Sequence, residues 1–313
     1  MPASYVHQCI ARTAAGALFS TDSERHALLA GAEGPDPLFF SFFGKPCPPA
    51  VASSLHTKKT DDFLLALCEA CKVSPLTRAY CCGFFTHYAG DTTFHPFVYA
   101  HSLTPDGAYS GTVHCTLEHQ LETLRYRRDG HASGLPVQMA GFAALTAPEK
   151  DEIARAFAEA LAKVFPNQAM KPAAIRRSFD DSVHICHILR SESGRKYRTL
   201  GAVLSPFKLD APLHAHMMPV EPPAADIAND AHAAWCSIWE PERSRNESCQ
   251  DLFDKAVARS QQLVDAALGF MDGRVSAAVL RALHGGLSYD SGLPWQDTCP
   301  AKVAPGVPKP ARS

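Results

Sequence analysis

The sequence lacks both a long apolar run and a marked excess of one charge. No stretch of about 18 apolar residues occurs, so no membrane-spanning helix is expected. A net charge of −2 over 313 residues argues against a large basic surface for duplex nucleic acid. The N-terminus shows no positive segment followed by an apolar one, which predicts that the protein has no secretory signal and is cytoplasmic.

Several catalytic motifs are also absent. The chain contains no Gly-x-Ser-x-Gly nucleophile elbow, no Gly-x4-Gly-Lys-Ser/Thr phosphate loop, no His-Glu-x-x-His zinc motif and no His-Asp dipeptide. These absences argue against serine hydrolases of the α/β type, P-loop nucleotidases, the common metalloproteases and the HD-type phosphohydrolases. Alternating apolar and polar residues, which would predict strands, are also missing. The sequence therefore predicts an all-α protein without internal repeats.

The chain has 11 cysteines, an odd number in a sequence without a secretory signal. Cys68 and Cys71 form a Cys-x-x-Cys pair within an amphipathic helical pattern, and no second pair of this kind follows. Cys81 and Cys82 fall in another apolar helical segment. We interpret these cysteines as reduced thiols that fill the core rather than as disulfides or zinc ligands.

The most informative stretch runs from Thr86 to Pro96, where His87, Asp91 and His95 recur every four residues. Each step turns a helix by about 400°, so the three side chains form one ridge. A polar ridge on a helix that is otherwise apolar almost all round is costly unless it binds a metal ion or is paired. The ridge therefore predicts a metal site. Pro96 predicts that the helix ends at His95.

Other candidate ligands are weaker when taken singly. His114 and Glu118 repeat the four-residue spacing, which fits either a metal site or a simple hydrogen-bonded pair. His7 adjoins the apolar stripe of a first helix, where a histidine is more often a core residue than a ligand. Asp36 lies in a Pro-rich turn as either a turn residue or a pre-ordered ligand. His56 is expected to open a helix.

The apolar periodicity predicts helices along most of the chain. A capping box of Thr146 and Glu149 marks the start of one of them. The predicted helical segments are 5–19, 23–30, 56–68, 76–95, 112–126, 145–165, 172–204, 224–239 and 250–270. We predict one helical domain over residues 1–290 and a disordered tail over 291–313, where Pro, Lys and Ala dominate. His184 and His187 have a spacing that can bind a metal ion, but Asp180-Asp181 are the only carboxylates nearby, so a second site there is not favoured. His214 and His216 are interpreted as residues of a surface loop.

Taken in order, these motifs resemble the zinc-dependent phospholipase C family. The resemblance rests on Tyr5-Val6-His7, Gly31 to Asp36, Leu55-His56-Thr57, the ridge of His87, Asp91 and His95, and His114-x3-Glu118. It covers residues 1 to about 130, with a weaker similarity over 235–263. The resemblance implies an all-α bundle around a polynuclear zinc site, a fold that the family shares with single-strand-specific P1-type nucleases.

The resemblance also implies a role for each ligand. Asp36, His56, His87 and Asp91 are expected to hold one zinc ion, His95, His114 and Glu118 a second, and His7 with bridging Asp91 a third. Two to three zinc ions are therefore expected. In the secreted relatives an N-terminal tryptophan completes the third site, whereas this chain begins Met-Pro-Ala-Ser. Asp36 is further expected to act as a general base toward the attacking water.

The function implied is zinc-dependent hydrolysis of a phosphodiester or phosphoester, with a small phosphoester or a phospholipid head group as the substrate. One alternative is a P1-nuclease-like phosphohydrolase of nucleotides or single strands. It would need stacking surfaces, for which Phe94, Phe97, Tyr99 and Tyr109 are candidates. Another alternative is a non-catalytic metal-binding scaffold. Eight zinc-type ligands favour an enzyme over a scaffold.

Overall fold

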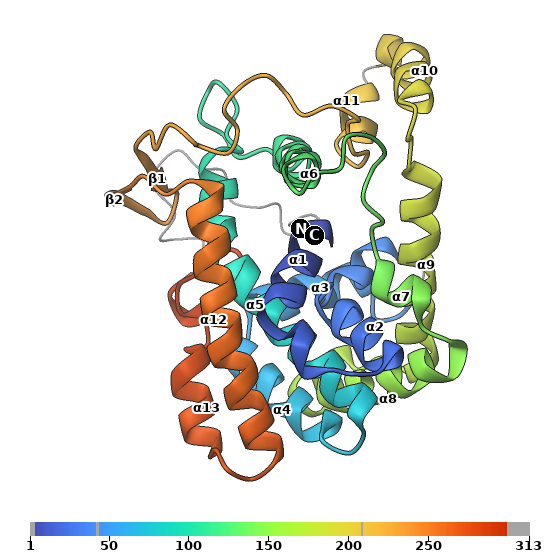
Figure 1. Ribbon diagram of the computed structural model, residues 1–313, viewed down its shortest axis with the longest axis vertical. Coiled ribbons are helices and arrows are strands. Elements are labelled where there is room, and N and C mark those ends of the chain that lie inside the picture. The colour runs from blue at the N-terminus through green and yellow to red at the C-terminus, as the bar shows by residue number, and fades with distance from the viewer. Residues whose placement is uncertain (1–3, 42–43, 208, 299–313) are drawn as a thin grey trace.

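The structure is a computed structural model that describes residues 4–41, 44–207 and 209–298. Helices dominate, as the sequence predicts (Figure 1). The helices are α1 (Ser4–Ala15), α2 (Asp22–Gly31), α3 (Pro48–Thr57), α4 (Thr60–Cys71), α5 (Pro75–Ala100), α6 (Gly111–Arg128), α7 (Ala140–Ala144), α8 (Ala147–Val164), α9 (Pro172–Leu189), α10 (Arg195–Leu204), α11 (Asp210–His214), α12 (Cys249–Met271) and α13 (Ala277–His284). Short 3-10 helices are η1 (Gly16–Leu18), η2 (Asp36–Phe40), η3 (Pro166–Gln168), η4 (Ser205–Phe207) and η5 (Trp295–Asp297). Among the described residues, no helix is both long and apolar enough to cross a bilayer.

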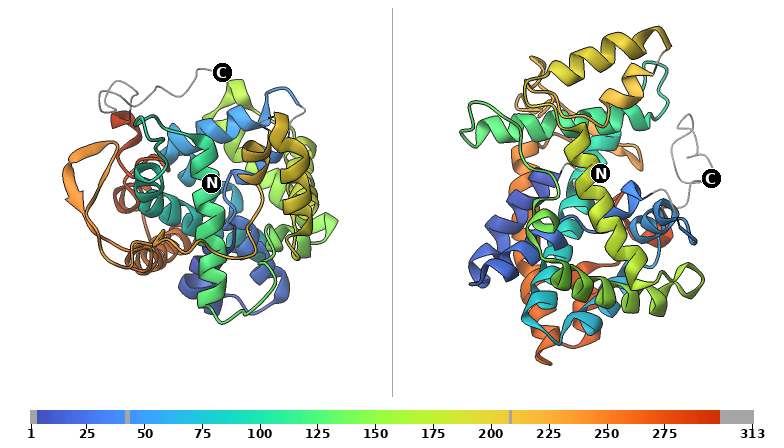
Figure 2. Two further views of the ribbon diagram at one scale, coloured as in Figure 1. Left: turned by 90° about the horizontal axis from the view of Figure 1, so that it is seen from above. Right: turned by 90° about the vertical axis from the view of Figure 1, so that its right-hand side faces the viewer.

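The central element is α5, which runs through the middle of the bundle (Figures 1 and 2). Helices α2 and α12 make its most extensive contacts, and α1, α4 and α8 also pack on it. Most of its side chains are buried, because neighbours cover it on nearly every side. Its polar ridge therefore lies inside the protein rather than on a solvated face.

The predicted end of this helix at His95 is wrong, because α5 continues through Pro96 to Ala100. Proline removes the N–H that would pair with the Thr92 carbonyl oxygen. The backbone of Gly292 lies against that oxygen, and a Cβ at Gly292 would approach it to 2.4 Å. A C-terminal loop thus covers the point where the proline interrupts the hydrogen bonds of the helix.

Helices α2 and α5 cross so closely that their backbones touch. A Cβ on Gly31 would lie 1.9 Å from the Tyr80 carbonyl oxygen, and a Cβ on Gly83 would lie 2.0 Å from the Leu28 carbonyl oxygen. Only glycine fits at either position without moving a helix. This crossing fixes the turn that follows α2, and with it Asp36, relative to the α5 ridge.

The larger hydrophobic core lies around α2, α4, α5 and α8 and extends to α9 and α12. Cys68, Cys71, Cys81 and Cys82 are fully buried in it, and the cysteines in the described part of the chain are free thiols. This confirms the interpretation of these residues as core thiols. A smaller core joins α1, α6 and the second half of α5 to the start of α12.

Two expectations for the C-terminal half differ from the structure. Residues 224–239 are not helical, because the segment leads into an antiparallel hairpin of β1 (Trp235–Ser237) and β2 (Glu240–Arg245). Trp235 packs edge-on against Phe97 of α5, so the hairpin is anchored by one buried aromatic side chain. Residues 291–298 of the predicted tail fold back, and the Trp295 indole N–H donates to Asp61 at 3.0 Å. Residues 299–313 lie outside the described residues.

The contact between α2 and α5 predicts a stability effect. Replacing Gly83 by Ala should lower the free energy of unfolding by at least about 2 kcal/mol, because the new methyl group has no room between the two backbones. The urea midpoint at constant slope measures this effect. Gly111→Ala is the control, because its Cβ meets no heavy atom within 4 Å. Equal stability of the two variants would contradict the close crossing.

Candidate metal centre

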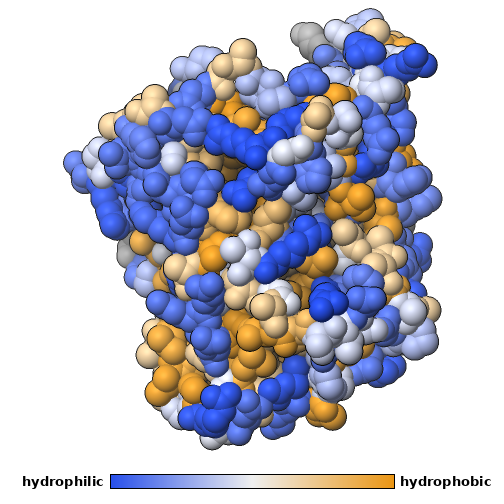
Figure 3. Space-filling view, viewed as in Figure 1, coloured by the Kyte–Doolittle hydropathy of each residue, from blue (hydrophilic) through white to orange (hydrophobic). Residues whose placement is uncertain are grey.

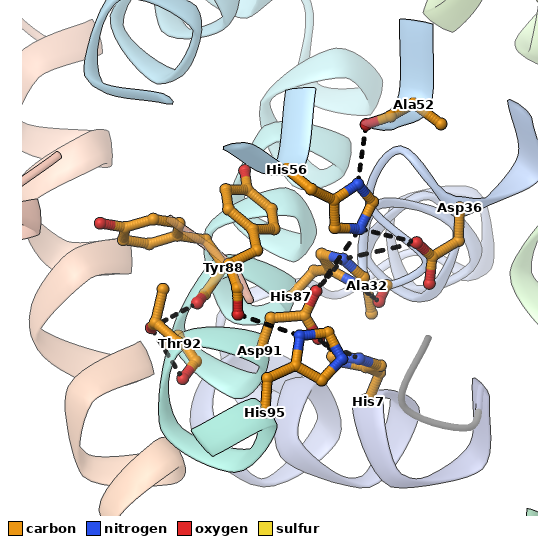
Figure 4. A network of polar contacts seen from close by, with 12 residues as sticks. His7, Ala32, Asp36, Ala52, His56, His87, Tyr88, Asp91, Thr92 and His95 are labelled. Carbon is orange, nitrogen blue, oxygen red and sulfur yellow. Dashed lines mark hydrogen bonds and ion pairs between the residues drawn. The ribbon is translucent and has the colours of Figure 1, made fainter. Parts of the chain in front are cut away.

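Side chains from five elements converge along the buried ridge of α5, and Figure 4 shows those from four of them, α1, η2, α3 and α5. The converging side chains are His7 of α1, Asp36 of η2, His56 of α3, His87, Asp91 and His95 of α5, and His114 and Glu118 of α6. Each of the eight is at most 4% exposed. The structure therefore brings together every ligand that the sequence analysis singled out.

The side chains form three groups whose ligand atoms lie within 4.8 Å of one another. The groups are His7, His87 and Asp91; Asp36, His56 and His87; and His95, His114 and Glu118. Asp91 lies between them, with Oδ1 3.1 Å from His7 Nε2 and Oδ2 3.0 Å from His87 Nε2. His95 Nε2 lies 3.9 Å from Asp91 and 3.4 Å from Glu118, so it stands between the first and third groups.

Three of the imidazoles are oriented by backbone carbonyl groups. His56 Nδ1 lies 2.8 Å from the Ala52 oxygen, His87 Nδ1 3.0 Å from the Ala32 oxygen, and His95 Nδ1 2.9 Å from the Tyr289 oxygen. A carbonyl oxygen only accepts, so each Nδ1 carries the proton and donates. In the neutral ring the opposite Nε2 then offers its lone pair to the cluster, which is the arrangement of a metal-binding histidine.

This arrangement leaves electron pairs facing one another. In the described part of the chain, Nε2 of His7, His56 and His87 and both carboxylate oxygens of Asp91 have no hydrogen-bond partner. Nitrogen and oxygen atoms that face each other at about 3 Å in a buried site need a proton or a metal ion between them. Imidazole nitrogens with carboxylate oxygens form the ligand type of zinc. The residues present therefore fit a zinc cluster.

The electrostatics keep Asp91 ionised. Burial would raise its pKa, but the imidazoles of His87 and His95 outweigh burial and hold the pKa of Asp91 well below its usual range. The pKa of His7 is lowered, by burial first and then by His87, so this ring is neutral. Burial would also lower the pKa values of His56, His87 and His95, but the nearby carboxylates outweigh burial and raise them, so these three rings lose protons when they bind a metal ion.

Two glycines allow the ligands to approach. Gly34, with φ of +54°, adopts the left-handed conformation in the turn before Asp36, and a Cβ there would lie 2.2 Å from the His87 ring. Gly90 of α5 leaves room for His7, because a Cβ there would come within 2.9 Å of the His7 ring.

The position of His56 differs from the expectation. It lies in the last turn of α3, not at a helix start, so a carbonyl of its own helix can orient the ring.

A cavity of about 530 Å³ opens beside the cluster. Its walls include the candidate ligands His56, His95 and His114. Its walls also include Tyr99, Tyr109, Ile185, Leu189, Leu213, His216 and Asp290. Its volume suits a small organic ligand. A second, smaller cavity of about 30 Å³ is lined by both Asp36 and Glu118, which is room for a water molecule.

The aromatic candidates separate into two classes. Tyr99 and Tyr109 line the cavity and stack with ring centroids 5.0 Å apart, and Trp239 packs edge-on against Tyr99 at 4.7 Å. Phe94 and Phe97 are buried in the smaller core instead. The exposed pair His184 and His187 belongs to no metal-binding group among the described residues.

The sequence analysis missed the loop that follows α13. The Tyr289 carbonyl orients His95, and the Tyr289 N–H donates to the His56 carbonyl oxygen at 2.8 Å. Tyr88 of α5 holds this loop, because its hydroxyl donates to the His284 oxygen at 2.6 Å and accepts from the Leu287 N–H at 2.8 Å. The only local signal was the Gly285-Gly286 pair, which predicts a turn but not its position.

Two further buried carboxyl groups lie behind the cluster. Glu33 accepts from the Ser4 hydroxyl at 2.5 Å, and Glu122 accepts from the Tyr5 N–H at the start of α1 at 2.5 Å. Burial raises the pKa of Glu33 to about 7 and that of Glu122 to about 8. Both therefore hold a proton at neutral pH more readily than an exposed glutamate does.

The model of the zinc dependent phospholipase C family matches residues 6–171, which is more than half of the chain. The matched range contains all eight converging side chains. No curated protein and no solved structure gives a significant match.

The loop after α13 generates a prediction. Tyr88→Phe should leave the Leu287 N–H unpaired, which lowers the free energy of unfolding by about 1–3 kcal/mol, whereas the His284 oxygen keeps the Arg259 guanidinium as a donor at 3.2 Å. It should also weaken zinc binding about tenfold, because the carbonyl that orients His95 becomes mobile. Competition titration with a chelating dye measures the affinity. Tyr80→Phe is the control, since the Tyr80 hydroxyl has no hydrogen-bond partner in the described structure. Equal zinc affinities would refute the role of the loop.

Glu122 generates a pH prediction. Its raised folded-state pKa means that the folded chain binds a proton which the unfolded chain has released above about pH 5. The stability from this group is complete at acid pH and is lost as the pH rises through about 8. Between pH 5 and 8 the free energy of unfolding of Glu122→Gln should therefore fall by about 1 kcal/mol less per pH unit than that of the wild type. Exposed Glu221→Gln should leave the decline unchanged. Parallel curves for wild type and Glu122→Gln would contradict the assignment.

Proposed function

Since the chain belongs to the zinc-dependent phospholipase C family, we propose that it hydrolyses phosphodiesters at a cluster of two to three zinc ions. One observation carries the proposal. Imidazoles oriented by backbone carbonyls point their Nε2 atoms at the buried Asp91 carboxylate, and a cavity large enough for a substrate opens beside them. Burying these imidazoles and carboxylates together costs free energy that a bound cation would offset.

The eight side chains would divide the metal ions among the three groups. His87 and Asp91 belong with His7 in one group, His87 with Asp36 and His56 in another, and His95 with His114 and Glu118 in the third. Bound zinc would lower the pKa of a coordinated water to about 7 and neutralise charge on the phosphoryl oxygens. Shared ligands would keep the ions close together, so that one substrate phosphate can contact more than one.

Asp36 is the proposed general base. Its Oδ1 lies 3.1 Å from His56 Nε2, and its side chain also lines the small cavity that it shares with Glu118. A water molecule there would lie beside a carboxylate able to accept its proton as its oxygen attacks phosphorus. The P–O bond to the leaving alcohol then breaks, and the alkoxide takes up a proton. The products are a phosphomonoester and an alcohol.

The aromatic wall supports a second candidate for the substrate. Tyr99 and Tyr109 stack within the cavity close to His114, at centroid distances of 4.8 and 5.9 Å from that ring. A nucleobase could stack on this wall while its phosphate reaches the cluster, as in single-strand nucleases. The substrate panel therefore contains a simple aryl phosphodiester, phosphatidylcholine and single-stranded DNA.

The double variant His87→Ala/Asp91→Ala tests the proposal. It removes the two side chains that link the groups, so bound zinc should fall from two to three ions per chain to at most one. Hydrolysis of every substrate in the panel should fall by at least about 1,000-fold. Plasma mass spectrometry measures the metal, and phosphate-ester assays measure the activity. The control His184→Ala/His187→Ala removes two exposed histidines of α9 and should change neither quantity.

Unchanged hydrolysis in the double variant would sink the proposed mechanism. Stoichiometric zinc without turnover of any phosphodiester would instead favour the non-catalytic scaffold. Cleavage of DNA in preference to the lipid would select the nuclease-like alternative, and loss of that preference in Tyr109→Ala would assign it to the aromatic wall.

A further inference from the structure

Exposed hydrophobic side chains gather in one stretch of the C-terminal half. Of the large hydrophobic residues that the described structure leaves exposed, Ile188, Val203, Phe207 and Leu209 lie within 22 consecutive positions. Phe207 is 70% exposed and Val203 is 60% exposed. Single exposed apolar residues need no explanation, but a cluster of them indicates a surface that meets something apolar.

The same stretch is cationic. Arg195, Lys196 and Arg198 lie in the first turn of α10 and are exposed. From Ser193 to Phe207 the chain has no acidic residue, and no carboxylate pairs with these three cations among the ion pairs of the described residues. A protein with a net charge of −2 thus carries a local positive surface here.

Helix geometry places a cation, Lys196, and an apolar side chain, Val203, together on α10. The inner side packs on α11, where the Tyr197 ring stacks on His214 at 3.8 Å and Gly201 lies against the same ring. Seven residues turn a helix by about 700°, so Val203 lies within about 20° of Lys196 around the helix axis. Both lie on a different side of α10 from Tyr197 and Gly201. The Lys196 ammonium group donates to the Ile188 carbonyl oxygen at 2.6 Å, which brings the end of α9 alongside.

This surface adjoins the large cavity. Helices α10 and α11 lie at the upper end of the molecule, next to α6 and the end of α9 (Figures 1 and 2). The cavity is lined by Ile185 and Leu189 of α9, the helix that carries Ile188, and by Leu213 of α11, which packs on α10. In the space-filling view, mostly hydrophilic side chains with hydrophobic ones between them cover this end (Figure 3).

We propose that Ile188, Val203 and Phe207, with Arg195, Lys196 and Arg198, form a docking surface for an anionic lipid bilayer. Apolar side chains that enter the interface beside cations that meet anionic head groups are the chemistry of a peripheral membrane helix. A nucleic acid would satisfy the cations but would leave Phe207 and Val203 in water. The docking surface goes beyond the proposed function, and its value for catalysis rests on that function, because it would hold the cavity at a lipid surface.

Vesicle sedimentation tests the docking surface with the full chain. The probes are vesicles of phosphatidylcholine alone and of phosphatidylcholine with 30% phosphatidylglycerol. Wild type should bind the anionic vesicles, and salt should weaken binding. Val203→Ser/Phe207→Ser should bind about tenfold or more weakly, and Arg195→Gln/Lys196→Gln/Arg198→Gln about 100-fold more weakly. The control Val73→Ser/Val279→Ser removes Val73, which is 86% exposed in the turn before α5, and Val279, which is 50% exposed on α13 at the opposite end.

Two further measurements separate this inference from the proposed hydrolysis. His87→Ala/Asp91→Ala should bind vesicles like wild type, because docking needs no turnover. Val203→Ser/Phe207→Ser should hydrolyse a soluble aryl phosphodiester like wild type, because neither residue lines the cavity.

Three results would overturn the docking surface. They are no binding to anionic vesicles, equal binding by wild type and Val203→Ser/Phe207→Ser, and an equal loss of binding in the Val73→Ser/Val279→Ser control. Binding of single-stranded DNA that depends on the three cations, without binding of vesicles, would reassign the surface to nucleic acid.

Discussion

A carboxylate at the centre of a buried helix constrains the whole structure. Asp91 is fully buried, and an ion in that position costs several kcal/mol unless opposite charge or hydrogen bonds compensate it. The Nε2 atoms of His7, His87 and His56 lie 3.0–3.7 Å from its oxygens, so a proton or a metal ion held between these nitrogens and the carboxylate would supply the opposite charge. Because these rings belong to α1, α3 and α5, the three helices must be held in one arrangement for Asp91 to be tolerated.

The close packing of the bundle follows from this need. Gly90 lets α1 approach α5, Gly34 lets the turn before Asp36 approach His87, and Gly31 with Gly83 lets α2 touch α5. The approach of the turn after α2 brings the Ala32 carbonyl close enough to orient the His87 ring. The site is therefore set by backbone positions, which are stiffer than side chains, and a metal ion would find its ligands in place.

Sequence reasoning succeeded where one element decides the outcome. The ridge of His87, Asp91 and His95 follows from helical periodicity alone, and the Thr146 and Glu149 capping box follows from four consecutive residues. It failed where distant segments decide. Where α5 continues past Pro96 it is covered by Gly292, nearly 200 residues away, and the orientation of His95 depends on Tyr289. A proline signal is local, whereas both of these contacts are tertiary, so no window of sequence around Pro96 contains them.

The candidate ligands and part of the cavity wall come from different parts of the chain. All eight candidate ligands lie within residues 6–171, the range that matches the family. The far wall of the cavity comes from outside that range, with Leu189 and Leu213 on one side and Asp290 on another. The loop at Tyr289 connects the ligands to this wall. The Tyr289 carbonyl orients the ligand His95, and the next residue, Asp290, lines the cavity. Changes in the C-terminal part can therefore alter which phosphoester enters without altering the ligands, provided that the Tyr289 backbone stays in place.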